Sequence, residues 1–245
     1  MDNELVYVLH TRKYRETSQL VDLLSRQSGR LRVVARGSRP NSKTKKGSAL
    51  TPLQAFQPFF ASWLGRSDLK TLTSYESAGS VQLPQGDALY IGFYVNELLS
   101  RLLPEYIPLQ DLFDQYAKLV TLLGHGVDPE PELRIFELNL LDELGYGLNF
   151  YADSNDGSPI NPDRDYLFLP GESFSRIEIK SGQPLPDIFS GAHLLAIADH
   201  QFDSNAIRQS AKRLMRRALA SQLGDKPLYS RELYKQAVTT PGKIS

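Results

Sequence analysis

The chain has 245 residues, of which 41% are hydrophobic, and this is enough to bury a core in one large domain or in roughly two or three small ones. It contains no cysteine, which excludes disulfides, a thiolate nucleophile and a cysteine-based zinc site. No apolar run reaches the roughly 18 residues that a membrane helix needs, and the acidic residues 1–4 do not resemble a secretory signal. We therefore expect a cytoplasmic protein that does not bind membranes.

The formal net charge is zero, yet the charges are strongly segregated along the sequence. Residues 1–80 contain 13 Lys and Arg against 6 Asp and Glu, a net charge of +7. Residues 81–206 contain 6 against 20, a net charge of −14, and residues 207–245 contain 9 against 2, a net charge of +7. Such asymmetry is typical of proteins that bind nucleic acid through basic segments. The alternative is a set of ordinary solvated faces that happen to cluster.

The first 80 residues predict a small β-barrel. Residues 17–24 fit a strand or a helix by periodicity alone, but the turn signal at residues 27–30 favours a hairpin with the β-rich run that follows. Residues 36–48 hold glycines, serines and five cations but almost no apolar residue, which predicts an exposed loop. Five short strands suggest an OB-fold. We expect these strands in residues 5–9, 17–24, 31–35, 56–64 and 69–77.

The remainder predicts an α-helical domain that is interrupted by an insert. Apolar residues recur at helical spacing before Pro104, before Gly124 and before Gly145, which predicts a three-helix bundle over residues 88–103, 109–123 and 133–144. Residues 149–185 are rich in Asp, Asn, Ser, Gly and Pro and predict an irregular insert with strand-like pieces at 166–169 and 177–179. Helices are expected again at residues 186–198 and 204–223. The fold class is thus α+β, with an OB-fold in residues 1–80, a helical domain in residues 81–148 and 186–245, and the insert in residues 149–185.

Cations of the first segment are candidates for binding a phosphate backbone, because flexible lysines and arginines release condensed counterions without reading sequence. Aromatic residues of the same segment (Tyr14, Phe59, Phe60 and Trp63) are candidates for base stacking, although a core position is favoured for each. The alternative for the loop is a solvated linker. The candidate DNA-binding residues are Arg12, Lys13, Arg15, Arg30, Arg32, Arg36, Arg39, Lys43, Lys45 and Lys46.

A second basic group lies on the helix expected at residues 204–223. Steps of four place Arg208, Lys212 and Arg216 along one line of the helix, with Arg213 and Arg217 beside it. Five cations on one exposed face repel one another unless an anionic partner is present. That partner is either DNA or the acidic middle of this chain, and the sequence leaves both open.

Catalysis finds little support in the sequence. The four histidines, His10, His125, His193 and His200, have no metal-ligand spacing, and no phosphate-binding loop or nucleophile motif is present. The acidic pairs Glu130 with Glu132 and Asp142 with Glu143 stand at helix ends, where the helix dipole explains the first pair. We expect no enzyme activity, no metal and no cofactor. A two-metal nuclease with hidden carboxylates remains an alternative.

Arg134 lies within an apolar helix of an acidic region. A cation at the edge of an apolar groove can hold the C-terminal carboxylate of a peptide whose side chains fill the groove. From the residues alone, a contact within the helix to Glu130 or Glu137 is favoured.

Several stretches resemble the RecO family of bacterial recombination mediators. They are residues 8–18, residues 28–37 with the sequence SGRLRVVARG, residues 89–101, residues 133–147 and residues 226–233 with KPL followed by SREL. Each is weak alone, but together they span nearly the whole chain in the expected order.

The resemblance implies an OB-fold that binds single- and double-stranded DNA and anneals complementary strands. It also implies that the protein engages the C-terminal tail of the single-stranded DNA-binding protein and acts with RecR to load RecA. Arg134 matches the arginine that meets the carboxylate of this tail, so we expect a peptide site formed by Arg134, Leu133, Phe113 and Tyr116. Many family members hold zinc through four cysteines in the region of the insert, and this chain has none there. The alternative function is a protein-interaction adaptor whose basic C-terminal helix binds an acidic partner, with DNA binding secondary.

Overall fold

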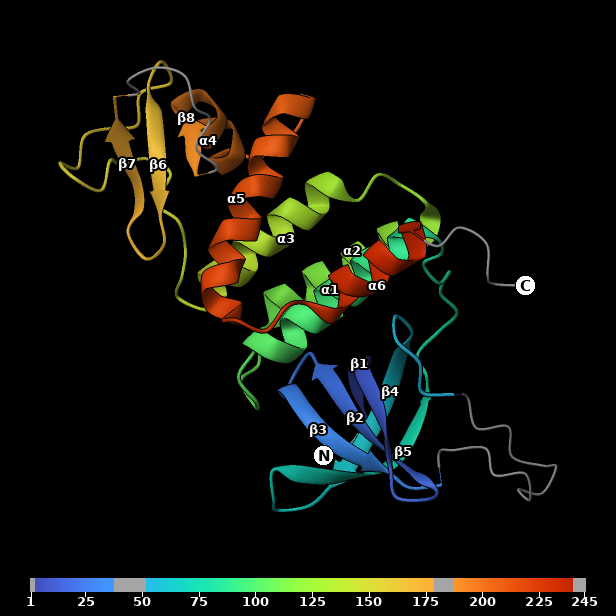
Figure 1. The fold of residues 1–245 in the computed structure, drawn as a ribbon. Helices are drawn as coiled ribbons and strands as arrows, with labels where there is room; N and C mark the ends of the chain where they lie inside the picture. Colours follow the sequence, from blue (N-terminus) through green and yellow to red (C-terminus); the bar gives the residue numbers. More distant parts are fainter. Residues whose placement is uncertain (1–2, 38–51, 179–186, 240–245) are drawn as a thin grey trace. The chain divides into compact units, whose positions relative to one another are not determined.

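The computed structural model describes residues 3–37, 52–178 and 187–239 (Figure 1). The chain forms two compact units. Unit 1 comprises residues 1–127 and 227–245, and unit 2 comprises residues 128–226. Unit 2 is therefore an insertion in the sequence of unit 1. The expected domain boundaries stay a prediction.

Unit 1 begins with a closed five-stranded barrel, which confirms the predicted OB-fold class. The order around the barrel is β1-β2-β3-β5-β4, and β4 pairs back onto β1. Only β3 and β5 run parallel among these pairs. The five strands are β1 (Glu4–Tyr14), β2 (Ser18–Ser25), β3 (Gly29–Ala35), β4 (Pro58–Leu64) and β5 (Leu69–Ser77).

Successive side chains of a strand point alternately into and out of the barrel, and the inward-pointing ones form its core. Val6 and Val8 of β1 point inward and pack with Val33, Phe59 and Trp63, all of them buried. The first strand is longer than predicted, because a shift of register between Val8 and His10 allows pairing with β2 to continue to Tyr14.

Three helices complete unit 1: α1 (Asp87–Leu102), α2 (Gln110–His125) and α6 (Tyr229–Thr239). A buried polar chain joins the first two to the barrel, since the Tyr116 hydroxyl donates to Asn96 Oδ1 at 2.7 Å and Asn96 Nδ2 donates to the Leu9 carbonyl at 3.0 Å. Tyr7 packs edge-on against Tyr116, with ring centroids 5.1 Å apart. Burial raises the pKa of Tyr116, so this hydroxyl stays a donor. The sequence did not predict α6.

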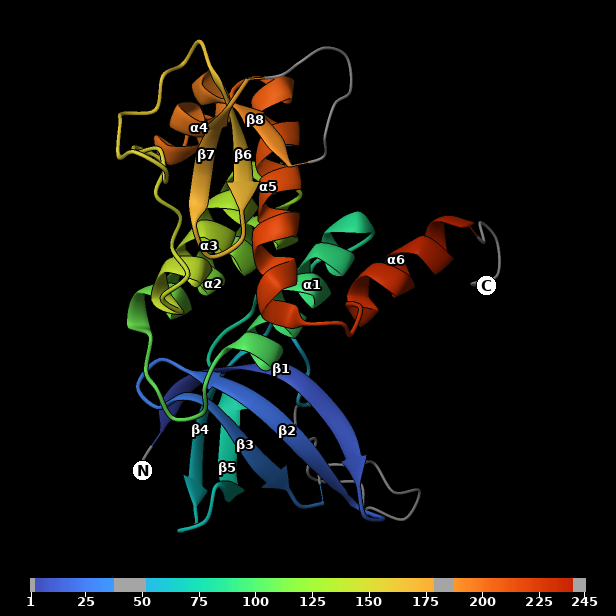
Figure 2. The ribbon, with the colours of Figure 1, turned by 60° about the vertical axis from the view of Figure 1, so that its left-hand side comes forward.

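Unit 2 contains a small sheet and three helices. The helices are α3 (Glu130–Glu143), α4 (Gly191–Ala198) and α5 (Asn205–Leu223), and the sheet has the order β7-β6-β8. Its strands are β6 (Asp165–Leu169), β7 (Ser173–Ile177) and β8 (Ile188–Ser190). α5 lies beside α3 in Figures 1 and 2. The third helix of the expected bundle, α3, belongs to unit 2 and packs with α5 there, and the bundle itself stays a prediction.

The insert is also more regular than predicted. Residues 165–177 form a β-hairpin, and Phe174 packs against Phe150 and Phe168 with ring centroids 5.3 and 5.8 Å apart. The helix expected from residue 186 begins only at Gly191, because Ile188–Ser190 pairs with β6 as a strand and Ser190 caps the helix.

Candidate nucleic-acid interface

One end of the barrel carries exposed cations from β1 and from the turns that follow β1 and β3. Gln19 of β2 pairs with Lys13 on one side and with Ala35 on the other, so the β1–β2 turn and the end of β3 share this end of the barrel. We call Arg12, Lys13, Arg15 and Arg36 the barrel-end cations. All four are exposed, and none forms an ion pair with another described residue. The guanidinium of Arg15 lies 5.3 Å from the centre of the Tyr14 ring.

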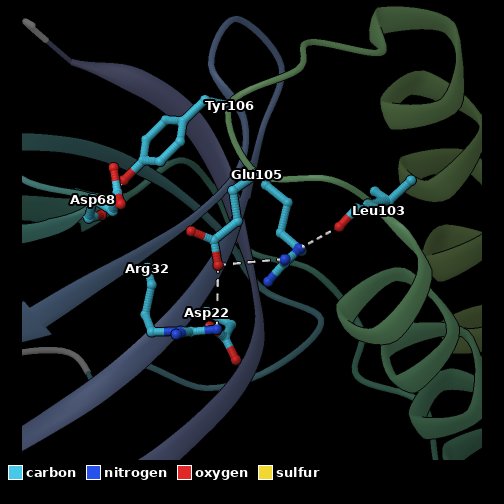
Figure 3. A network of polar contacts seen from close by, with 7 residues as sticks. Asp22, Arg32, Asp68, Leu103, Glu105 and Tyr106 are labelled. Atoms are coloured by element: carbon cyan, nitrogen blue, oxygen red, sulfur yellow. Dashed lines mark hydrogen bonds and ion pairs between the residues drawn. The ribbon is translucent and has the colours of Figure 1, made fainter.

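Arg30 and Arg32 behave differently. Glu105, in the connection between α1 and α2, lies 3.4 Å from Arg30 Nη2 and 3.2 Å from Arg32 Nη2 (Figure 3). Arg32 Nε also donates to Asp22 Oδ1 at 2.9 Å, and Arg30 Nε donates to the Leu103 carbonyl at 2.9 Å. The hydrogen bond to Asp22 is the main cause of the raised pKa of Arg32. Because two carboxylates already compensate these two cations, they are weaker candidates for phosphate binding than the barrel-end cations.

The connection between α1 and α2 carries Glu105, and we call this connection the strap. It contacts the barrel at further points. The Tyr106 N–H donates to the Arg30 carbonyl at 2.9 Å, and the Tyr106 hydroxyl donates to the Asp68 carbonyl (Figure 3). Lys70 Nζ lies 5.2 Å from the centre of the Tyr106 ring. Gly29 lies under Ile107 so closely that a Cβ there would stand 2.1 Å from the Ile107 carbonyl oxygen. Sequence reasoning missed this strap, although Gly29 was noted as a turn residue.

The remaining candidates of the first segment divide by exposure. Phe59 and Trp63 belong to the barrel core, whereas Phe60 is 36% exposed and Tyr14 is half-buried. Only the last two therefore offer a ring face at the surface. The predicted loop cations Arg39, Lys43, Lys45 and Lys46 lie outside the described residues, so their assignment stays a prediction.

The basic face of α5 meets carboxylates of its own unit. Arg208 Nη1 lies 2.7 Å from Asp128 Oδ2, Lys212 Nζ lies 3.9 Å from Glu130 Oε1, and Arg217 forms a two-pronged contact with Asp187. The hydrogen bond to Asp187 raises the pKa of Arg217. These contacts correspond to the second option left open by the sequence, the acidic middle of the chain.

Two cations of the same face have other surroundings. Arg213 donates from Nη2 to the Ile188 carbonyl at 2.7 Å, and its guanidinium lies 4.5 Å from the centre of the Phe189 ring. Arg216 is exposed and has no ion-pair partner among the described residues. Arg213 is thus held against β8, while Arg216 faces solvent.

The residues expected to form a peptide site are all buried. Arg134 and Glu137 of α3 form an ion pair at 2.7 Å, with side chains only 6% and 1% exposed. Leu133 is buried on the same helix. In unit 1, Phe113 and Tyr116 are buried on α2, where both rings pack against Tyr7. The contact to Glu137 is the one favoured from the residues alone, and the role of Arg134 in peptide binding stays a prediction.

No metal centre is evident in the part of the chain that the structure describes, since no three of its His, Asp and Glu side chains gather closely enough to hold an ion. Asp142, one of the acidic candidates, has its pKa raised by burial. Within the same residues, no helix combines the length and the apolar character needed to cross a membrane.

Comparisons with known proteins cover almost the whole chain. The family model described as Recombination protein O N terminal matches residues 1–81, and the one described as Recombination protein O C terminal matches residues 83–232. A protein named DNA repair protein RecO from Pseudomonas paraeruginosa is 44% identical over 238 residues, which is 97% of each chain. Proteins of the same name from Haemophilus influenzae and Pseudomonas putida are 44% and 43% identical, over 95% and 94% of this chain and 95% and 96% of their own lengths.

Proposed function

Because the chain belongs to the RecO family of DNA repair proteins, we propose that it acts in recombinational repair by binding DNA and not by covalent chemistry. The observation that carries this proposal is the group of barrel-end cations, which stand exposed at one end of an OB-fold barrel without an ion pair among the described residues. A phosphate backbone supplies the anions that such a group lacks. Contacts of this kind hold DNA regardless of its sequence, as a mediator that acts on many DNA ends requires.

Strand annealing follows from the same chemistry. A protein that neutralises the phosphates of two complementary strands lowers their mutual repulsion, and exposed rings stack on unpaired bases without sequence preference. Tyr14 beside Arg15, and Phe60 on β4, are the described aromatic residues of the barrel that support this role. We propose that both single- and double-stranded DNA bind, and that RecR and, indirectly, RecA act with the protein, as the family implies.

The proposal is tested by the joint substitution Arg12→Gln, Lys13→Gln, Arg15→Gln and Arg36→Gln. Loss of four phosphate contacts should weaken binding of labelled single-stranded DNA by at least tenfold at low salt, measured by fluorescence anisotropy, and should slow annealing in parallel. The control is Arg66→Gln with Lys118→Gln, which removes two exposed cations elsewhere in unit 1. Equal losses in both variants would mean that the barrel end has no special role.

We further propose that the C-terminal tail of the single-stranded DNA-binding protein binds near Arg134. The support is a guanidinium buried in an apolar helix, whose Nε has no hydrogen-bond partner among the described residues. When a peptide carboxylate binds, the Arg134 guanidinium has to leave Glu137 or contact both carboxylates at once. If Arg134→Ala binds an acidic peptide that ends in Phe as tightly as the wild type, this assignment is wrong.

The alternative, a protein-interaction adaptor, is favoured by one observation only: three cations of α5 already pair with carboxylates of unit 2. Under that alternative, the four barrel-end substitutions leave DNA affinity unchanged, or DNA affinity is absent from the start.

A further inference from the structure

The ion pairs of α5 differ in their exposure to water from the buried ion pairs of a protein interior. Arg208, Lys212 and Arg217 come from one helix. Their partners are Asp128, just before α3, Glu130, the first residue of α3, and Asp187, which directly precedes β8. The three carboxylates thus come from two separate parts of the chain that both precede α5, and α5 lies beside α3 (Figures 1 and 2).

The pairs are also accessible. The side chain of Arg217 is 51% exposed, and the other two cations are 29% and 39% exposed. Ion pairs in contact with water contribute little net stability, because water and salt screen the attraction. A polyanion that releases its counterions on binding competes effectively with single carboxylates for such cations.

The spacing of the cations suits a regular row of phosphates. Arg208, Lys212 and Arg216 follow at steps of four, so their Cα atoms extend over roughly 12 Å along one line of the helix. Duplex DNA presents one charge per roughly 1.7 Å of its axis, and its stiff backbone offers several phosphates to a straight row of this length. Arg216 needs no displacement, because it has no ion-pair partner among the described residues and is exposed.

We propose that Asp128, Glu130 and Asp187 form a removable internal cover over a second DNA-binding surface on α5, which binds duplex DNA when backbone phosphates displace the three carboxylates. This rests on the proposed function and adds a regulated site to it. The cover lowers the affinity of unit 2 for isolated phosphates and makes binding depend on a partner that supplies several phosphates at once. Arg213 is excluded from the surface, because the Ile188 carbonyl and the Phe189 ring hold it.

The test is the joint substitution Asp128→Asn, Glu130→Gln and Asp187→Asn, which keeps shape and removes three negative charges. Affinity for duplex DNA should rise at least fivefold at low salt, and the plot of log K against log salt should steepen by up to about three. The matched control is Asp163→Asn, Glu172→Gln and Asp199→Asn, which removes three exposed carboxylates of unit 2 for which no ion pair with a described residue is found. If the two triple variants have the same affinity and the same slope, the three carboxylates are only braces and the proposal is overturned.

A second measurement uses the wild-type chain and does not depend on how a variant folds. The Nε–H resonance of Arg217 should shift when a duplex is added, because this N–H leaves Asp187, while that of Arg213 stays in place. An unchanged Arg217 resonance at saturating duplex would overturn the proposal, as would a shift that appears with single-stranded DNA and not with the duplex. The triple substitution is also placed in the background that lacks the barrel-end cations. If the combined variant binds duplex DNA more tightly than the variant that lacks only the barrel-end cations, the second surface on α5 is supported. This result does not depend on whether the barrel end binds DNA, so the proposal for α5 and the proposed function can be refuted independently.

Discussion

Glu97 of α1 accepts three hydrogen bonds at the first turn of α6. Its carboxylate receives the N–H of Tyr229 at 2.9 Å, and the N–H and the hydroxyl of Ser230 at 2.8 and 2.7 Å. A helix leaves its first N–H groups unpaired, so a side chain from another helix acts here as the cap. Burial by itself raises the pKa of Glu97, but the bonds from Ser230 and Tyr229 outweigh it and lower the pKa below its ordinary value.

The docking of α6 should therefore depend on pH. A carboxylate whose pKa is lower in the folded state contributes stability above the pKa of the unfolded chain, about 4.3, and this stability is lost as the pH falls through the lower folded pKa. We expect hydrogen exchange at Tyr229 and Ser230 to accelerate in that acid range relative to the amides of α2. Glu97→Gln should lower the protection of these two amides, and their protection relative to the amides of α2 should no longer change with pH. An unchanged exchange rate in this variant would show that apolar contacts alone hold α6.

Asp153 organises the insert in a chain that has no cysteine for zinc. Its buried carboxylate accepts the N–H of Asn155 at 2.9 Å and that of Arg176 at 3.1 Å, tying a turn to β7. Asp153→Ala leaves two N–H groups without this acceptor, and each such loss costs about 1–3 kcal/mol. We expect faster hydrogen exchange throughout β6 and β7. The control, Asp156→Asn, changes an exposed carboxylate of the same turn and should have little effect. Equal protection in both variants contradicts this role for Asp153.

At the scale of elements, the strap between α1 and α2 depends on Gly29. This residue has φ of 72°, and a Cβ there would collide with the Ile107 carbonyl. Gly29→Ala should destabilise the barrel by more than about 2 kcal/mol, since backbone strain of about 1–3 kcal/mol adds to the collision. Trp63 is the chain's single tryptophan and lies in the barrel core, so its fluorescence during urea unfolding reports this change.

Gly37→Ala is the matched control for the strap. Gly37 also has a positive φ of 64°, but a Cβ there meets no atom within 4 Å. The difference between the two variants therefore isolates the contact with Ile107. If both lose the same stability, the conformation of Gly29 matters and the strap does not.

The sequence predicted elements whose signal is local. The barrel strands follow from β-rich runs and from the turn before Gly29, and α1, α2 and α5 follow from helical periodicity. α6 was missed because its docking depends on Glu97, more than 130 positions away. β8 was missed because three residues carry no periodicity and the strand exists only through its pairing with β6.

The same limit applies to the candidate site. The sequence named both basic groups, and it named the carboxylates of α3 only as residues favoured by a helix dipole. It did not distinguish Arg12, which is exposed, from Arg32, which is paired with Asp22 and Glu105. The partners of Arg32 come from another strand and from the α1–α2 connection, so only the fold separates the two arginines.

At the scale of the whole molecule, a chain of zero net charge contains cations that differ in whether a carboxylate compensates them. Within the described residues, the arginines of β3 and most cations of α5 have carboxylate or carbonyl partners, whereas the barrel-end cations have no ion pair. The account therefore assigns the first contact with DNA to the barrel end and a second, covered contact to α5. Net charge alone would have hidden both.

The most direct test of the central claim is a salt series of single-stranded DNA binding, followed by anisotropy in the wild type and in the variant that lacks the four barrel-end cations. Each phosphate contact contributes about 0.7 to the slope of log K against log salt on a single strand. We expect a steep slope in the wild type and a slope shallower by about three in the variant. Equal slopes in the two proteins, or binding that does not respond to salt, would contradict the account.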